Sequence, residues 1–130
     1  MNIKIPYTPR KHQSYLHQQI NRYRWSVLVC HRRFGKTVCM INHLIRSALL
    51  SKLKNPRFAY IAPTFKQDKS IAWDYMKQFT AKIPHTKFNE TDLRVDLTND
   101  SPIPLLGSEY RDGFSGSCSD GCEVGAVAWR

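Results

Sequence analysis

The sequence predicts an α/β fold in which parallel strands are joined by crossover helices. Two short apolar runs, 25–29 and 58–62, have the β-branched and aromatic content of buried strands. Each is followed by a segment with helical periodicity, and alternation of strands with helices is typical of parallel sheets. A chain of 130 residues with 42% apolar residues suits one domain with a modest core.

The first expected element is a helix that precedes the first strand. Thr8 suits the N-cap and Pro9 the first helical position, and the helix is expected to reach about Tyr23. Its expected buried side chains are Tyr15, Leu16 and Ile20.

A polar loop, 31–36, separates the first strand from a helix predicted to begin at Thr37. The apolar residues of this helix recur at spacings of three and four, which favours one buried face. The helix is predicted to end near 52–54, where lysines suit the C-terminal end of the helix dipole. The apolar residues are Val38, Ile41, Ile45, Ala48, Leu49 and Leu53.

Another helix is expected after the second strand, with Thr64 as its cap and Ile83-Pro84 as its end. One stripe of this helix is apolar and consists of Ala72, Tyr75, Met76, Phe79 and Ile83.

The alternating run 93–97 predicts a half-exposed strand, and 98–101 has the composition of a turn. Residues 103–106 are expected to return as a hairpin partner that two prolines confine to the edge of the sheet. The Gly- and Ser-rich stretch 107–121 is expected to be a loop, and 122–129 is a candidate last strand.

The charge is strongly basic and unevenly distributed. Twenty Lys and Arg face ten Asp and Glu, a net charge of +10, and no acidic residue precedes Asp68. This asymmetry favours a polyanionic partner, such as a nucleotide or nucleic acid, for the N-terminal half. Solubility alone is the simpler alternative.

The cysteines and the N-terminus indicate a reducing location without a membrane. Cys118 and Cys122 have a C-x3-C spacing, but no second pair of ligands follows, which disfavours a zinc site. No signal peptide and no apolar run of membrane-spanning length are present. The expected location is therefore the cytoplasm.

The segment Cys30–Thr37 resembles a phosphate-binding P-loop, whose pattern is G-x-x-x-x-G-K-[ST]. It departs from the pattern at Cys30, which replaces the first glycine. The G-K-T triplet alone is weak evidence, but it follows a predicted strand and opens a predicted helix, as phosphate binding requires. The alternative is a turn with an exposed lysine before an ordinary helix.

Each matching residue has a chemical role in such a loop. Gly35 allows the backbone to approach an anion, and Lys36 can reach the β- and γ-phosphates. The Thr37 hydroxyl can ligate Mg²⁺. An arginine within the loop, at Arg32 or Arg33, can contact the γ-phosphate; a solvated basic loop is the alternative.

The block 27–38 resembles the variant P-loop of tailed-phage terminase large subunits, in which the first glycine is commonly replaced and R-x-x-G-K-[ST] remains. The resemblance implies an ASCE-type P-loop NTPase fold with a parallel sheet and crossover helices. It implies an ATP site formed by Cys30, His31, Arg32, Arg33, Phe34, Gly35, Lys36 and Thr37, with Mg²⁺ at Thr37. It also implies that Arg32 is the arginine finger.

Other segments match this family in the same order. Residues 9–13 resemble its upstream adenine-recognition element, with Gln13 as the residue that reads the base through its amide. The segments 55–67 and 71–74 resemble its second strand and helix, and 88–97 resembles the following hairpin. The implied divisions are 1–24, 25–54, 57–83, 88–106 and a degenerate Walker B region at 107–130.

The resemblance fails where the hydrolytic carboxylates are expected. A P-loop ATPase needs Asp-Glu after an apolar strand, to hold the Mg²⁺ shell and orient the attacking water. In register with the family, Gly125 and Ala126 occupy these positions, and Glu123 is two residues early. The sequence therefore predicts ATP binding with little or no hydrolysis, an ATPase domain incomplete at its C-terminal end, and no nuclease domain.

The resemblance further implies a role in driving viral DNA into a capsid. The implied partners are double-stranded DNA, the portal protein, the small terminase subunit and a homo-oligomeric ring, in a bacterial host that carries a phage or prophage. Two alternatives stay open: a non-enzymatic basic module that binds DNA or a protein, and a P-loop ATPase of a helicase-like family.

Overall fold

The computed structural model describes residues 3–23, 26, 34–52, 58–62, 66–98 and 101–107. Helices and strands both contribute, so the chain is an α/β protein, as predicted. In chain order the elements are α1 (Lys11–Arg22), α2 (Lys36–Leu50), β1 (Tyr60–Ala62), α3 (Lys66–Thr80), β2 (Lys87–Asn89), β3 (Arg94–Asp96) and β4 (Pro102–Gly107).

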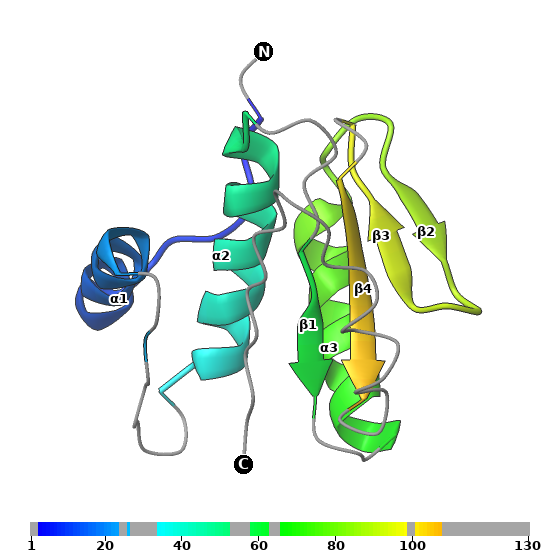
Figure 1. Ribbon diagram of the computed structural model, residues 1–130, viewed down its shortest axis with the longest axis horizontal. Coiled ribbons are helices and arrows are strands. Elements are labelled where there is room, and N and C mark those ends of the chain that lie inside the picture. Colours follow the sequence, from blue (N-terminus) through cyan, green and yellow to red (C-terminus); the bar gives the residue numbers. More distant parts are fainter. Residues whose placement is uncertain are drawn as a thin grey trace.

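The four strands form one sheet in the order β1-β4-β3-β2 (Figure 1). β1 runs parallel to β4, with Tyr60 opposite Leu105. The other two pairings are antiparallel, so the described strands make a mixed sheet, and the expected parallel P-loop sheet is not shown among them. Most of the predicted strand 25–29, and all of 122–129, lie outside the described residues.

The prediction that prolines confine the last strand to the edge of the sheet is wrong. β4 lies between β1 and β3, although it contains Pro102 and Pro104. The Leu105 N–H donates to the Leu93 carbonyl at 2.9 Å, on the β3 side. Because N–H directions alternate along a strand, both proline nitrogens face the β1 side. Pairing with β1 begins only at Leu105, so no ladder bond is lost there.

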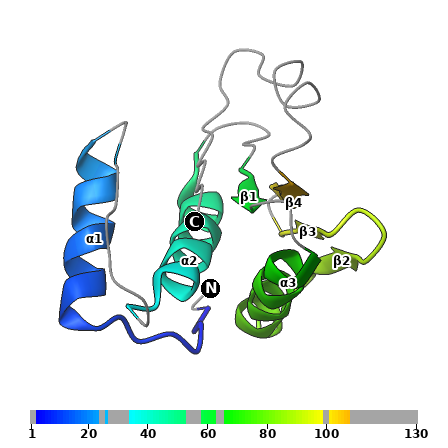
Figure 2. The same cartoon turned by 90° about the horizontal axis from the view of Figure 1, so that it is seen from below.

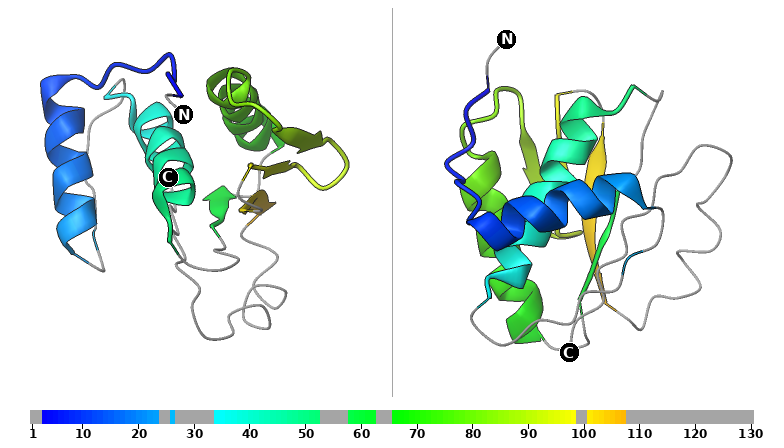
Figure 3. Two further views of the ribbon diagram at one scale, coloured as in Figure 1. Left: turned by 90° about the horizontal axis from the view of Figure 1, so that it is seen from above. Right: turned by 90° about the vertical axis from the view of Figure 1, so that its left-hand side faces the viewer.

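The helices form two layers beside the sheet. α2 and α3 lie next to one another against the sheet, and α1 crosses the outer side of α2 (Figures 2 and 3). One apolar core joins α2 and α3 to the strands; its fully buried members include Ile41, Ile45, Met76, Val95 and Ile103. Within the described part of the chain, no helix is both long and apolar enough to cross a membrane.

The inner face of α1 is polar, contrary to the prediction. Its buried residues are Gln13 and His17, while Tyr15 is 60% exposed. Leu16 and Ile20 are half-buried. The helix begins at Lys11, with Arg10 as its N-cap, and not at the predicted Thr8-Pro9. The apolar pattern of the sequence did not predict this interface, because the side chains that α1 buries against α2 are polar and form hydrogen bonds.

α2 and α3 agree with the predicted apolar faces. In α2, Ile41, Ile45 and Ala48 are buried, and the helix begins at Lys36, one residue before the predicted start. In α3, Ala72, Met76 and Phe79 are buried. α3 ends at Thr80 and is followed by a turn, so Ile83 belongs to the core without being helical.

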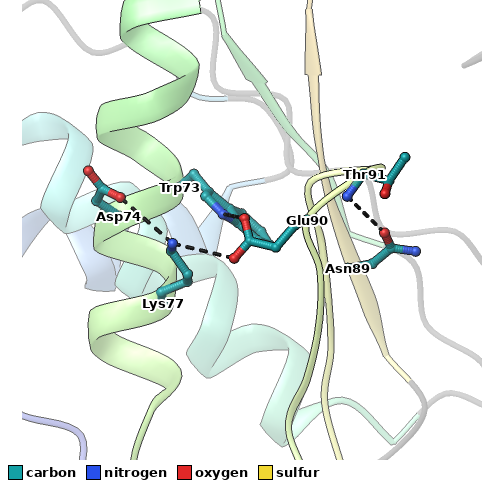
Figure 4. A network of polar contacts seen from close by, with 6 residues as sticks. All are labelled: Trp73, Asp74, Lys77, Asn89, Glu90 and Thr91. Atoms are coloured by element: carbon teal, nitrogen blue, oxygen red, sulfur yellow. Dashed lines mark hydrogen bonds and ion pairs between the residues drawn. The ribbon is translucent and has the colours of Figure 1, made fainter.

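A polar network attaches the β2–β3 hairpin to α3 (Figure 4). Trp73 is buried, and its Nε1 donates to Glu90 Oε2 at 2.9 Å. Lys77 Nζ lies 3.5 Å from Glu90 Oε1 and 5.7 Å from the centre of the Trp73 ring. Within the turn, Asn89 Oδ1 accepts the Thr91 N–H at 3.1 Å. These contacts hold the hairpin of β2 and β3 against α3.

Candidate nucleotide-binding site

The described part of the predicted P-loop is its last four residues, Phe34–Thr37, at the start of α2. Gly35 is the N-cap, with a φ of 83° in the left-handed region. Residues with a Cβ rarely adopt this conformation, so glycine is favoured here. A Cβ on Gly35 would also lie 2.8 Å from Gln13 Nε2 and 2.9 Å from an Arg10 nitrogen. The backbone conformation favours glycine, and a larger residue would also have to displace the ends of these two side chains.

Two side chains from the start of α1 hold this turn in place. Gln13 Nε2 donates to the Gly35 carbonyl at 3.3 Å, and an Arg10 guanidinium nitrogen donates to the Phe34 carbonyl. Gln13 Oε1 accepts the Arg10 N–H at 3.0 Å, which fixes the amide orientation. Gln13, the predicted adenine-recognition residue, therefore contacts Gly35 at the end of the predicted P-loop, although the two residues are 22 positions apart in the sequence.

The amide of Gln13 retains hydrogen-bonding capacity. A glutamine amide has two N–H donors and two acceptor positions, and these contacts use one of each. One donor and one acceptor position therefore remain for a base. However, Gln13 is only 4% exposed, so little of its amide edge is accessible to a base in this structure.

The start of α2 is chemically suited to an anion. No acidic residue lies in its first turn, and no side chain of the N-cap bonds to it. The helix dipole therefore presents its positive end without a carboxylate from the helix itself. Lys36 and Thr37 are both half-buried in this first turn, which is the position that phosphate and Mg²⁺ binding require of them.

The remaining predicted site residues lie outside the described residues. These are Cys30, His31, Arg32 and Arg33 in the loop, and Gly125 and Ala126 in the Walker B region. The roles expected of them, including the arginine finger at Arg32, stay predictions.

A cluster of polar side chains that the sequence did not reveal lies farther along the α1–α2 interface. His17 Nδ1 lies 3.0 Å from His43 Nδ1, and the two rings stack with centroids 5.2 Å apart. The Tyr7 hydroxyl lies 3.0 Å from His17 Nε2, and Cys39 Sγ lies 3.7 Å from the same atom. Single histidines without a motif give no signal in sequence, so only the structure shows that these residues meet.

The environment of this cluster disfavours a charge on its two histidines. The pKa of His43 is lowered to about 4, first by burial and then by the charges of His17 and Arg46. Burial, followed by the charge of Arg46, also lowers the pKa of His17 below its ordinary value. Burial raises the pKa of the Tyr7 hydroxyl. Among the described residues, no group of three or more His, Cys, Asp or Glu is placed to hold a metal ion.

No protein-family model matches the sequence, and comparisons with curated proteins and with solved structures give no significant match.

Proposed function

We propose that this chain binds Mg-ATP at the loop 30–37, as an ATP-binding domain of the terminase large subunit type. The observation that carries the proposal is the contact between the start of α1 and the turn before α2. Gln13 and Arg10 bond to the carbonyls of Gly35 and Phe34. In a nucleotide site, the residue that reads the base must lie beside the loop that binds the phosphates, and Gln13 lies in this position relative to the turn. An ordinary turn before a helix does not require a buried amide from another helix.

The residues at the start of α2 fit the proposed ligand. Gly35 has a left-handed conformation that favours glycine, and the ends of the Gln13 and Arg10 side chains lie where a Cβ would be. Lys36 would hold the terminal phosphates, and Thr37 would contribute its hydroxyl to Mg²⁺. Gln13 would orient the adenine through its remaining donor and acceptor positions. The bound metal would supply charge neutralisation of the phosphates.

In the proposed role, the domain belongs to a motor that moves double-stranded viral DNA into a capsid, in the cytoplasm of a bacterial host. The portal protein, a small terminase subunit and further copies in a ring are the partners proposed with it. Hydrolysis is proposed to be weak or absent, because Gly125 and Ala126 replace the acidic pair at the Walker B positions.

A titration with a fluorescent ATP analogue in the presence of Mg²⁺ tests this proposal. The unmutated chain is expected to bind the analogue, and unlabelled ATP is expected to displace it. Lys36→Ala is expected to weaken binding at least tenfold, about 1.4 kcal/mol. Lys52→Ala, which removes an exposed lysine after the other end of α2, is the matched control. Equal affinity of Lys36→Ala and the unmutated chain would refute the proposal.

The alternative, a basic module without nucleotide chemistry, is favoured by the net charge of +10. It predicts duplex DNA binding with a steep salt dependence and no response to Mg-ATP. The same titration separates the two functions, because this module gives no saturable signal with the nucleotide.

A further inference from the structure

The outer face of α1 carries a regular stripe of polar and aromatic side chains. Lys11, Tyr15, Gln18 and Arg22 follow one another at spacings of four, three and four residues, and all four are exposed. At about 100° per residue these spacings place them on one side of the helix. Gln13 and His17, which face α2, lie on the opposite side. We name these four residues the α1 stripe.

The α1 stripe is positively charged, and the helix offers no compensating acid. α1 contains no Asp or Glu, and the first acidic residue of the whole sequence is Asp68. Arg10, next to the start of the helix, is exposed as well. The Arg22 guanidinium lies 5.7 Å from the centre of the Tyr23 ring, which is 54% exposed. This face therefore combines cations with exposed tyrosines.

The four residue types of the stripe are those that contact the nucleic-acid backbone in complexes. Lysine and arginine pair with phosphates, and tyrosine and glutamine side chains donate hydrogen bonds to phosphate oxygens. From Lys11 to Arg22 the helix rises about 16 Å, enough to follow several phosphates of one strand. A convex helix face suits the backbone of a duplex, whereas binders of single strands use a groove.

We propose that the α1 stripe binds the sugar-phosphate backbone of duplex DNA without reading its sequence. This inference deepens the proposed function, on which it rests, by assigning the DNA contact to a surface. The same helix bonds to the P-loop turn through Gln13 on its inner face. α1 thus separates the DNA contact from the nucleotide site by the width of one helix.

Fluorescence anisotropy with a labelled duplex, measured without nucleotide over a series of salt concentrations, tests the proposal. The double variant Lys11→Gln/Arg22→Gln is expected to bind about tenfold more weakly and to show a slope of log K against log salt smaller by about two. Tyr15→Phe is expected to weaken binding by a smaller factor, because it removes only a hydroxyl donor.

The matched control is Lys82→Gln/Lys87→Gln, which removes two exposed lysines outside α1, one in the turn after α3 and one in the edge strand β2. An equal loss in the control would show a net-charge effect and would overturn the proposal, as would absence of duplex binding by the unmutated chain. Tighter binding to a single strand than to the duplex, unaffected by Tyr15→Phe, would also overturn it, because that result indicates base stacking.

Nucleotide binding by the same variants separates this inference from the proposed function. The stripe variants are expected to keep their affinity for the ATP analogue, and Lys36→Ala is expected to keep its affinity for the duplex. An unmutated chain that binds the analogue but not the duplex would refute this inference alone. An unmutated chain that binds the duplex through the α1 stripe but not the analogue would refute nucleotide binding alone.

Discussion

His17 Nδ1 and His43 Nδ1 lie 3.0 Å apart between α1 and α2. Such a bond requires a proton on one nitrogen and a lone pair on the other. A neutral pair satisfies this condition, whereas two fully protonated rings would place N–H groups face to face. Because the N-terminal end of α1 bonds to the turn before α2, the protonation of this pair bears on the candidate nucleotide site.

The histidine pair predicts that the chain loses stability in mild acid. The pKa of His43 is about 4 in the fold and near 6.5 in the unfolded chain, and the pKa of His17 is also lowered. The unfolded state therefore binds protons first as the pH falls. The free energy of unfolding is expected to be constant above pH 6.5. As the pH is lowered from 6.5 to 4, it is expected to decrease by about 1 kcal/mol per pH unit. Urea unfolding at several pH values measures this.

The variant His43→Gln keeps a polar side chain but does not titrate, so it is expected to flatten this pH dependence. His85→Asn is the control, because His85 is exposed and has a φ of 60°, which asparagine tolerates. An unchanged pH profile in His43→Gln would show that the buried pair is not the cause.

Replacement of Gly35 is expected to damage both stability and nucleotide binding. Gly35→Ala must adopt a φ of 83° and must displace the Gln13 amide. The expected loss of unfolding free energy is about 1–3 kcal/mol. Chemical denaturation measures it, with Ser47→Ala within α2 as the control. A stable Gly35→Ala with an unchanged affinity for the ATP analogue would show that the turn has a different conformation.

Gln13 has two roles that two substitutions separate. Gln13→Glu keeps an acceptor for the Arg10 N–H but cannot donate to the Gly35 carbonyl or to a base. It is expected to lose about 1–2 kcal/mol of stability and any preference for ATP over GTP. Gln13→Ala is expected to show the same loss of preference.

Competition of ATP and GTP against the fluorescent analogue measures this preference, with the exposed Asn21→Ala as the control. If both Gln13 variants still discriminated between ATP and GTP, Gln13 would be a structural residue that does not read the base.

The bond between Trp73 and Glu90 is expected to stabilise the hairpin against α3. In a double-mutant cycle, Trp73→Phe and Glu90→Ala should couple by about 1 kcal/mol, since the indole N–H bonds to a charged oxygen. Asp74→Ala breaks only an exposed 4.0 Å ion pair with Lys77 and should change stability by less than about 0.5 kcal/mol. Additive effects of Trp73→Phe and Glu90→Ala in urea unfolding would argue against this bond.

The sequence predicted the elements whose signal is local. The apolar periodicity of 38–49 and 72–79 predicted α2 and α3, and the alternation at 93–97 predicted β3. The prediction failed where the place of an element in the fold depends on residues far away in the sequence. Pro102 and Pro104 occupy an interior strand because their nitrogens face a part of the sheet that β1 does not pair with.

For the candidate site, the P-loop pattern predicted Gly35, Lys36 and Thr37, and the family resemblance predicted Gln13; their roles toward a nucleotide stay predictions. That Gln13 bonds to Gly35 depends on how α1 packs on α2, and no local pattern encodes it. The His17–His43 pair was not predicted for the same reason. The tyrosine at position 15 appeared suited to burial, yet the polar contacts of Gln13 and His17 turn it outward.

Thermal melts with and without excess Mg-ATP test whether the turn before α2 binds Mg-ATP. Ligand binding to the native state raises the melting temperature by mass action. At a ligand concentration of a hundred times Kd, the free energy of unfolding rises by about 2.7 kcal/mol. We expect a cooperative melt whose midpoint rises with Mg-ATP in the unmutated chain and does not rise in Lys36→Ala. A cooperative melt that Mg-ATP leaves unchanged, or raises equally in both chains, would contradict this expectation.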